Sequence, residues 1–255
     1  MTENRPIEDS MKRLTCLAAL CLLPAAAQEP PASVIYIYRE QVRPGKIAAF
    51  TRIEEGAAQS CARMKCPNPY IAISSVSGPS EFWWINGFES NDAMERVQAA
   101  YAANQEIMKE LNSVAESKGD LVFPAEVWLA RFREDLSGAA GAGFVYSRYL
   151  SISIQHVRPG QMASFEKARQ RPRPGRTQWI YQVMSGTADN TFLVILGGRT
   201  MQEVMDPPER RASAAGDLLQ VDLDSSVTRL FVVTPSMSMP AQSWVESDPE
   251  FWKRP

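Results

Sequence analysis

Aromatic and polar side chains alternate along two predicted strands and could line a ligand cavity. Four of them share the face that we expect to look inward: Tyr36, Tyr38, Trp84 and Asn86. Because successive side chains of a strand point to opposite faces, the other, more apolar face is expected to pack on helices. An aromatic cavity with a few polar groups suits a flat organic ligand. The alternative is that these side chains fill the core, where Tyr and Trp are routine once their polar atoms have partners.

A strand in the second half of the chain carries smaller polar side chains in the equivalent places. Ser151 and Ser153 are expected on its inward face, opposite Ile152 and Ile154. His156 is the one histidine of the sequence and could act as a base or as a haem ligand. It shares the face of the two isoleucines and lies at the end of the strand, which argues against a place in the cavity.

Other patterns that carry chemistry are missing from the sequence. It has no phosphate-binding glycine loop and no Gly-x-Ser-x-Gly nucleophile motif. One histidine and four cysteines do not make a zinc site at these spacings, and we expect neither a metal nor a cofactor. A formal net charge of -2 provides no basic field for nucleic acid, so we expect no nucleic-acid partner.

The first part of the chain has the layout of a secretory signal peptide. Lys12 and Arg13 precede an apolar run that ends in an Ala-x-Ala pattern at Ala27. The run is too short to cross a bilayer, which takes roughly 20 helical residues, so no transmembrane segment is expected. We therefore predict cleavage near Ala27 and a secreted or periplasmic protein.

Two cysteines remain after that cleavage, Cys61 and Cys66. In an oxidising compartment such a pair favours a disulfide. Five residues apart, they sit about 140° from each other on an ideal helix, so a bridge requires the helix to end between them. A Pro-Asn-Pro sequence at 67–69 supplies that ending. The alternative is two separate thiols.

The phrase Val-Arg-Pro-Gly occurs twice, at 42–45 and 157–160, each time between a strand-like and a helix-like run. Around each copy the predicted elements follow the order β-α-β-β-α-β, which is the split βαβ unit of ferredoxin-like folds. We therefore predict an α+β protein made of two tandem ferredoxin-like units. The expected organisation is 1–27, N-terminal extension and signal; 33–134, first repeat; 135–143, linker; 144–236, second repeat; and 237–255, C-terminal tail.

Two helices are predicted from the helical spacing of apolar residues. A helix is predicted at 46–65, with Glu54 on its solvated face. A single uninterrupted helix is predicted from Ala93 to Lys118. The tail, with Trp244 among acidic residues and prolines, either docks on the body or a neighbour, or frays.

The stretch from Tyr36 to Lys46, followed by Phe50, resembles the start of domains in the dimeric α+β barrel superfamily. The nearest groups are NIPSNAP-like proteins and then antibiotic-biosynthesis-monooxygenase-like domains, and 151–165 is a weaker version. The resemblance implies that the two sheets of one chain pack into a pseudo-dimeric barrel, as a monomer with higher oligomers left open. Members of this superfamily include cofactor-free monooxygenases and haem-handling proteins, so the fold alone does not assign a function.

We predict a secreted barrel that binds a small apolar or aromatic molecule or is otherwise non-catalytic. The alternative is a cofactor-independent monooxygenase-like enzyme, in which Tyr38, Trp84 and Asn86 hold an aromatic substrate. Haem binding through His156 is the further alternative. A cavity lined by the aromatic face would favour a binder or an enzyme.

Overall fold

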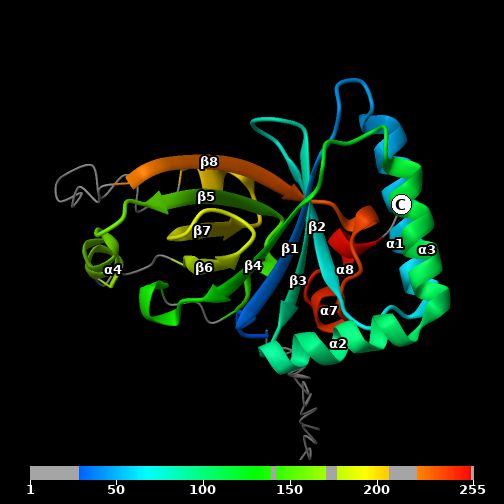
Figure 1. The fold of residues 1–255 in the computed structure, drawn as a ribbon, viewed down its shortest axis with the longest axis horizontal. Helices are drawn as coiled ribbons and strands as arrows, with labels where there is room; N and C mark the ends of the chain where they lie inside the picture. The colour runs from blue at the N-terminus through cyan, green and yellow to red at the C-terminus, as the bar shows by residue number, and fades with distance from the viewer. Residues whose placement is uncertain (1–28, 139–141, 171–176, 207–222, 254–255) are drawn as a thin grey trace, which may run out of the picture.

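The chain contains both strands and helices, and the computed structural model describes residues 29–138, 142–170, 177–206 and 223–253 (Figure 1). The elements are, in order, β1 (Val34–Gln41), α1 (Ile47–Met64), β2 (Tyr70–Ser75), β3 (Glu81–Phe88), α2 (Asn91–Ala103), α3 (Gln105–Lys118), β4 (Glu126–Phe132), η1 (Glu134–Leu136), η2 (Phe144–Tyr146), β5 (Tyr149–Val157), α4 (Met162–Arg169), β6 (Trp179–Ser185), β7 (Thr191–Gly198), α5 (Met201–Met205), β8 (Leu223–Val233), η4 (Pro235–Met237), α7 (Gln242–Ser247) and α8 (Pro249–Trp252).

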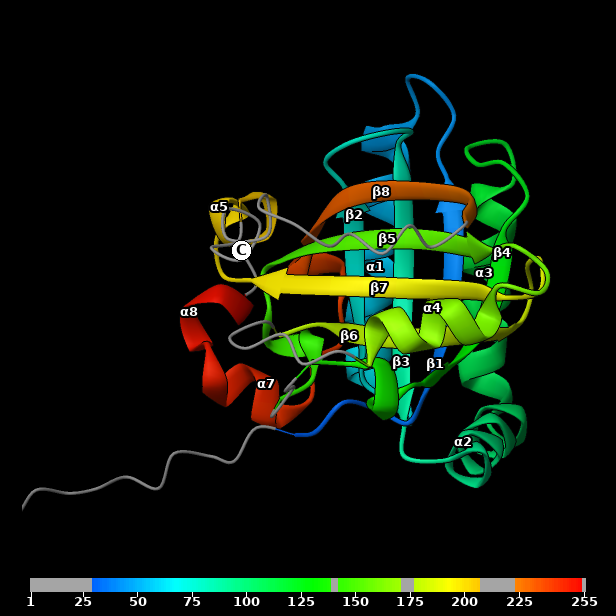
Figure 2. The ribbon, with the colours of Figure 1, turned by 90° about the vertical axis from the view of Figure 1, so that its left-hand side faces the viewer.

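The strands form one closed antiparallel barrel in the order β1-β3-β2-β8-β5-β7-β6-β4. The first half of the chain contributes β4-β1-β3-β2, and the second half contributes β8-β5-β7-β6. Two seams, β2 with β8 and β4 with β6, join the halves. Figure 2 shows β5 and β7 lying across β1 and β3, which run behind them. The predicted α+β class and the barrel are confirmed.

One apolar cluster fills the barrel, and every strand contributes to it. Its strand members are Ile35, Ile37, Ile71, Ile73, Trp83, Ile85, Trp128, Ala130, Leu150, Ile152, Ile154, Trp179, Tyr181, Val183, Leu193, Ile195, Phe231 and Val233. On each strand these residues are two apart, as the alternation of a strand requires. The barrel is therefore a packed core, as expected for eight strands.

Helices cover the outside of both halves (Figure 1). Phe50 of α1 packs on Phe82, with ring centroids 4.9 Å apart. In the second half, Phe165 of α4 packs on Phe192 at 4.5 Å. Each of these phenylalanines follows one of the two Pro-Gly turns, at Gly45 and Gly160, whose positive φ angles favour glycine. The turns thus place an aromatic anchor of each helix against its sheet.

The helix predicted from Ala93 to Lys118 is in fact two helices, α2 and α3. Asn104 separates them with an extended ψ of 90°, and its side-chain oxygen accepts from the backbone N–H of Ile107 at 3.1 Å. The expectation of one helix was wrong because asparagine offers the backbone a local hydrogen bond that starts a new helix.

The C-terminal segment docks on the barrel. Trp244 of α7 and Trp252 of α8 belong to the cluster that fills it. Asp248, between the two helices, accepts two hydrogen bonds of 2.9 Å from the guanidinium of Arg148. A bidentate pair of this kind fixes orientation as well as position.

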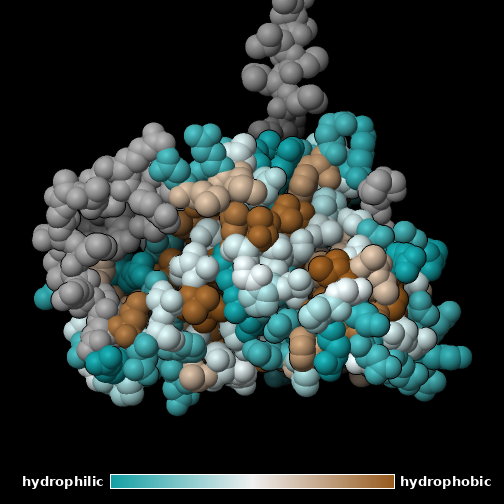
Figure 3. All heavy atoms as spheres, turned by 90° about the horizontal axis from the view of Figure 1, so that it is seen from above, coloured by the Kyte–Doolittle hydropathy of each residue, from teal (hydrophilic) through white to brown (hydrophobic). Residues whose placement is uncertain are grey.

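The surface mixes polar and apolar side chains. Exposed apolar residues such as Val76, Met184 and Val227 occur on it, and Figure 3 shows small apolar groups separated by polar ones. Within the described ranges, no helix has the length and apolar character needed to cross a membrane. The predicted signal peptide at 1–27 and part of the predicted linker lie outside the described residues.

Gly186 is a point of close approach at the seam of β4 and β6. Its φ is +100°, and a Cβ atom there would collide with the carbonyl oxygen of Val127. We expect Gly186→Ala to lower the free energy of unfolding by about 3 kcal/mol. Gly56→Ala on α1 is the control: nothing lies near its added methyl group, and it should stabilise by about 0.5–1 kcal/mol. Urea denaturation measures both, and equal effects would contradict this view of the seam.

Candidate functional site

A pocket of about 570 Å³ opens at one end of the barrel. Its lining comes from segments that are far apart in the sequence: Glu29, Pro30, Pro31, Ala32, Ser33, Ile35, Asn68, Pro69, Ile85, Gly87, Phe88, Glu89, Ala93, Val97, Gly143, Phe144, Val145, Tyr181 and Trp244. Of these, Ile35, Ile85 and Tyr181 belong to the cluster inside the barrel. The pocket therefore continues the barrel interior outward, and its size is that of small-molecule sites.

Glu29 is the carboxylate that the surrounding chain holds at this pocket. It accepts hydrogen bonds from the Ser243 hydroxyl and, at 3.3 Å, from the indole N–H of Trp244. The backbone N–H of Glu29 donates to the Tyr146 hydroxyl at 2.8 Å. The short segment before β1 is thus tied to α7 and η2, which places a charged acceptor beside aromatic rings.

Two further polar side chains that line the pocket already make hydrogen bonds within the protein. The Asn68 amide nitrogen donates to the Asn86 side-chain oxygen at 3.3 Å and to the Pro69 carbonyl at 3.1 Å. The Tyr181 hydroxyl donates to the Ala32 carbonyl at 3.1 Å. Burial raises the pKa of Tyr181, so this phenol remains a neutral donor.

A disulfide lies just before Asn68 in the chain. The structure joins Cys61, in the last turn of α1, to Cys66, after the helix has ended at Met64. Lys65 between them takes a left-handed conformation, and its N–H caps the Cys61 carbonyl. The cross-link therefore closes the turn that leads into the pocket wall.

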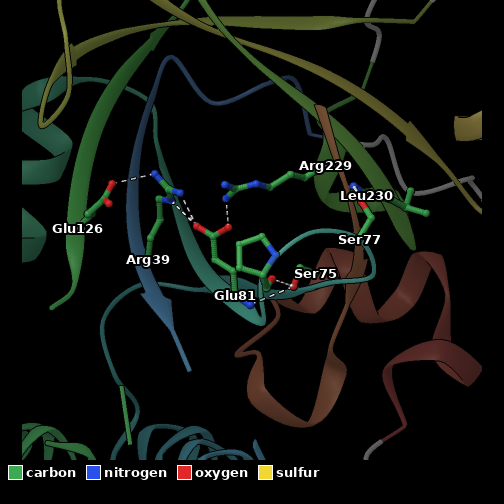
Figure 4. Close-up of polar contacts among 8 residues, drawn as sticks. Arg39, Ser75, Ser77, Glu81, Glu126, Arg229 and Leu230 are labelled. Carbon is green, nitrogen blue, oxygen red and sulfur yellow. Dashed lines mark hydrogen bonds and ion pairs between the residues drawn. The ribbon is translucent and has the colours of Figure 1, made fainter. Parts of the chain in front are cut away.

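A charged cluster lies toward the other end of the barrel (Figure 4). The Arg39 guanidinium donates to the Glu81 carboxylate and, at 2.9 Å, to Glu126. Arg229 of β8 pairs with the second oxygen of Glu81. Two arginines and two glutamates balance in charge, and Glu81 joins a residue of the first half to one of the second.

The Arg39 guanidinium also lies between two indole rings. Its Cζ is 3.9 Å from the ring centroid of Trp128 and 4.6 Å from that of Trp83. The N–H groups of both indoles are buried with no hydrogen-bond partner among the described residues. Stacking on a buried cation favours both rings, which offsets part of the cost of the unpaired N–H groups.

A third polar group lies outside the barrel, under α1 and α3. The Lys118 ammonium is 2.8 Å from Glu40 and 2.6 Å from Glu54, and all three side chains are buried. Tyr38 donates to Glu40 at 2.9 Å, while burial and that carboxylate raise the pKa of Tyr38. Lys118 also faces the ring of Trp84 at 5.3 Å. Glu54 was expected at the solvated surface, which was wrong because α3 covers this face of α1.

The inward face predicted for the first half is its outward face. Tyr38 and Trp84 lie 5.8 Å apart between the sheet and α1, in the same cluster as Phe50. Tyr36 and Asn86 are cross-strand neighbours on this same outer face. The assignment was reversed because a closed barrel takes the driest, isoleucine-bearing face inside, whereas the tyrosine hydroxyl finds its partner beneath the helices.

The same reversal applies to the second half. Ser151 and Ser153 face outward, and the Ser153 hydroxyl bonds to Thr228, while Ile152 is inside the barrel. His156 therefore lies on the face of β5 that points into the barrel. It sits at the end of the strand, however, where its Nδ1 is 2.7 Å from the Thr191 hydroxyl. The four residues predicted from the first half thus lie together on the outside of the barrel, but the two serines lie on the other half, so the six do not form one site.

The sequence reasoning missed the residues that do converge. Phe88, Phe144 and Trp244 line the pocket from three separate segments, and Arg39 and Glu81 form the charged cluster. For the cluster a signal was available, because Arg39 and Glu81 interrupt apolar faces of their strands and a buried charge needs a partner. For the pocket no local pattern exists.

The comparisons with known proteins concern the fold. A putative monooxygenase from Fusobacterium nucleatum subsp. nucleatum matches with a TM-score of 0.50 and 8% identity, over 80% of this chain and 93% of that one. A putative monooxygenase from Lactobacillus acidophilus NCFM matches at 0.46 and 11%, over 79% and 94%. A chlorite dismutase variant from Candidatus Nitrospira defluvii, in complex with cyanide, matches at 0.46 and 9%, over 85% and 95%. No family model and no curated protein matches the chain.

The match to the Fusobacterium nucleatum protein agrees with the predicted barrel fold and overturns the main functional prediction. A non-catalytic or ligand-binding barrel was expected. The Fusobacterium nucleatum protein, which shares the fold, is described as a putative monooxygenase, so the prediction was wrong and its alternative of a monooxygenase-like enzyme has the better support. At 8% identity the match itself shows the fold alone.

Removing the charge of Glu81 should destabilise the protein strongly. Glu81→Gln leaves Arg229 without its carboxylate and leaves Arg39 with only the exposed Glu126, so we expect the free energy of unfolding to fall by about 3–5 kcal/mol. Glu126 is the other partner of Arg39, and the Glu126 side chain is 59% exposed. Glu126→Gln should therefore lower the free energy of unfolding by less than about 1 kcal/mol. Urea denaturation of both variants provides the comparison, and losses of the same size would contradict the bridging role of Glu81.

Glu54 should make stability depend on pH. Burial raises its pKa above the ordinary 4.5, with Lys118 opposing and Glu40 adding to the shift. Tyr38 is the remaining titratable group in this cluster. The folded protein then binds a proton that the unfolded chain releases, so stability falls as pH rises through the window just above 4.5.

The variant Glu54→Gln cannot release that proton. Its free energy of unfolding should equal that of the wild type at the acidic end of the window and exceed it at higher pH. Thermal or urea unfolding at a series of pH values measures the difference. Glu55→Gln, a half-exposed neighbour on α1, is the control and should run parallel to the wild type. If the stability of Glu54→Gln changed with pH in the same way as that of the wild type, Glu54 would not be the source of the pH dependence.

Proposed function

We propose that the protein is an enzyme that oxidises an aromatic compound with dioxygen, without a resident cofactor, in the pocket at the end of the barrel. The observation that carries the proposal is the pocket itself: about 570 Å³, with Phe88, Phe144, Tyr181 and Trp244 in its lining. Aromatic walls favour flat rings, and a volume of this size admits a small fused ring system. The description of the Fusobacterium nucleatum protein with this fold supports the reaction class.

The reaction needs only a base and an electron-rich substrate. Loss of a proton from an activated methylene gives a carbanion, which transfers an electron to dioxygen and then forms a carbon–oxygen bond. Loss of water from the resulting hydroperoxide leaves a carbonyl group, so one oxygen atom enters the product and the other leaves as water. The substrate supplies all the electrons, and no external reductant is required.

Glu29 is our candidate for the base. Its carboxylate lines the pocket and is oriented by Ser243 and Trp244. A carboxylate held beside apolar walls can take a proton from a bound substrate, and a positioned base contributes about 10²–10⁴-fold to a rate. The mostly apolar lining also suits dioxygen, an apolar molecule.

Haem binding does not fit this pocket as described. His156, the one histidine of the chain, is not in the lining and bonds to Thr191 at the end of β5. The pocket thus offers no histidine ligand for a haem iron, and we derive no step through haem.

Two further inferences concern the origin and the location of the protein. The common strand order of the two halves and the repeated Val-Arg-Pro-Gly phrase support a tandem duplication of a ferredoxin-like unit, with NIPSNAP-like proteins as the nearest group. The apolar run that ends at Ala27 supports secretion, and the Cys61–Cys66 disulfide suits an oxidising compartment.

Oxygen uptake with hydroxylated anthrones, whose ring methylene is activated by the carbonyl group opposite, tests the proposal. The wild type should consume dioxygen and form a carbonyl product labelled from isotopic dioxygen. Glu29→Gln should lower kcat about 100-fold, because the base is lost. Glu95→Gln, which removes an exposed carboxylate of α2 outside the lining, is the control and should stay within about threefold.

The absence of uptake by the wild type would overturn the proposed reaction. Full activity of Glu29→Gln would overturn the role of Glu29 alone. A Soret band after addition of haem, retained through gel filtration and lost in His156→Ala, would favour the haem alternative instead.

A further inference from the structure

One wall of the pocket comes from α2, a helix that makes few contacts with the rest of the fold. None of its residues is buried. Ser90 caps its first turn by accepting from the N–H of Ala93 at 3.1 Å, and Asn104 ends it and starts α3. Both ends are thus satisfied locally, so α2 is a separate unit and not an extension of α3 (Figure 1).

Two small side chains of α2 form its part of the pocket lining. Ala93 and Val97 are four residues apart and therefore lie on one face, one turn from each other. Ile35 and Phe144 belong both to this lining and to the cluster inside the barrel. The barrel side of the pocket is therefore a packed core that resists change, while the α2 side is a single helix face with small residues.

The charge of the lining restricts the ligand further. Glu29 and Glu89 are its charged members, and no Lys or Arg of the described residues lines the pocket. An anionic ligand would meet two carboxylates without a balancing cation, at a cost in a mostly apolar site. The pocket therefore suits an uncharged aromatic molecule.

We propose that Ala93 and Val97 of α2 determine how large an uncharged fused-ring ligand the pocket accepts. The inference rests on the proposed function, since it concerns the same pocket, but it makes a claim about binding that does not require turnover. A larger side chain at either position shortens the space that faces the barrel core, and a smaller one lengthens it. Ligand size is therefore selected by the helix and not by the barrel.

Titration calorimetry with phenol, naphthol and anthrol, all uncharged near neutral pH, tests the inference on the purified wild type and three variants. Ala93→Phe should weaken the binding of naphthol about tenfold or more and leave phenol within about threefold. Ala99→Phe adds the same side chain to the same helix at an exposed position outside the lining, and should change neither. Val97→Ala should strengthen the binding of anthrol several-fold, a gain that a folding defect cannot produce.

Equal effects of Ala93→Phe and Ala99→Phe would overturn the inference, as would a wild type that binds none of the three probes. Unchanged anthrol affinity in Val97→Ala would count against it in the same way. Failure of the proposed reaction looks different: the wild type would bind the probes with the predicted dependence on size, yet consume no dioxygen.

Discussion

Glu81 is the carboxylate on which the closed barrel depends. It receives Arg39 from β1 and Arg229 from β8, so one buried side chain connects the two halves of the chain next to the seam of β2 and β8. That seam has only three residue pairs in register, from Ile73 to Ser75. A buried carboxylate that satisfies two guanidinium groups holds such a short seam in one geometry, because any other arrangement leaves a buried charge unpaired.

Closure of the barrel determines where a ligand can bind. Side chains from all eight strands pack its middle, so no channel runs between the sheets. The charged cluster and the indoles that flank Arg39 occupy one region of the interior. The pocket lies at the other end of the barrel. Its walls come from the chain before β1, the loop at Asn68, α2 and α7. The site is thus built by segments added to the barrel, on a packed core.

Much of the fold could be predicted from the sequence, because its signals are local. The two Pro-Gly turns and the β-branched runs indicated the strands and their order. The alternation of Tyr36 and Ile37 showed that two faces exist, but which face is inside depends on closure, and hence on contacts between residues more than a hundred positions apart. The pocket could not be predicted for the same reason: Phe88, Phe144 and Trp244 meet only after the barrel and the tail have packed.

In the proposed enzyme the ligand sits at the end of the barrel and not beneath the helices. A crystal structure of the protein with a bound naphthol tests this directly. We expect density for the ring between Phe88, Phe144 and Trp244, within reach of the Glu29 carboxylate. Density for the ring beside Tyr38 and Trp84, or anywhere else with the pocket at the barrel end empty, would contradict this placement.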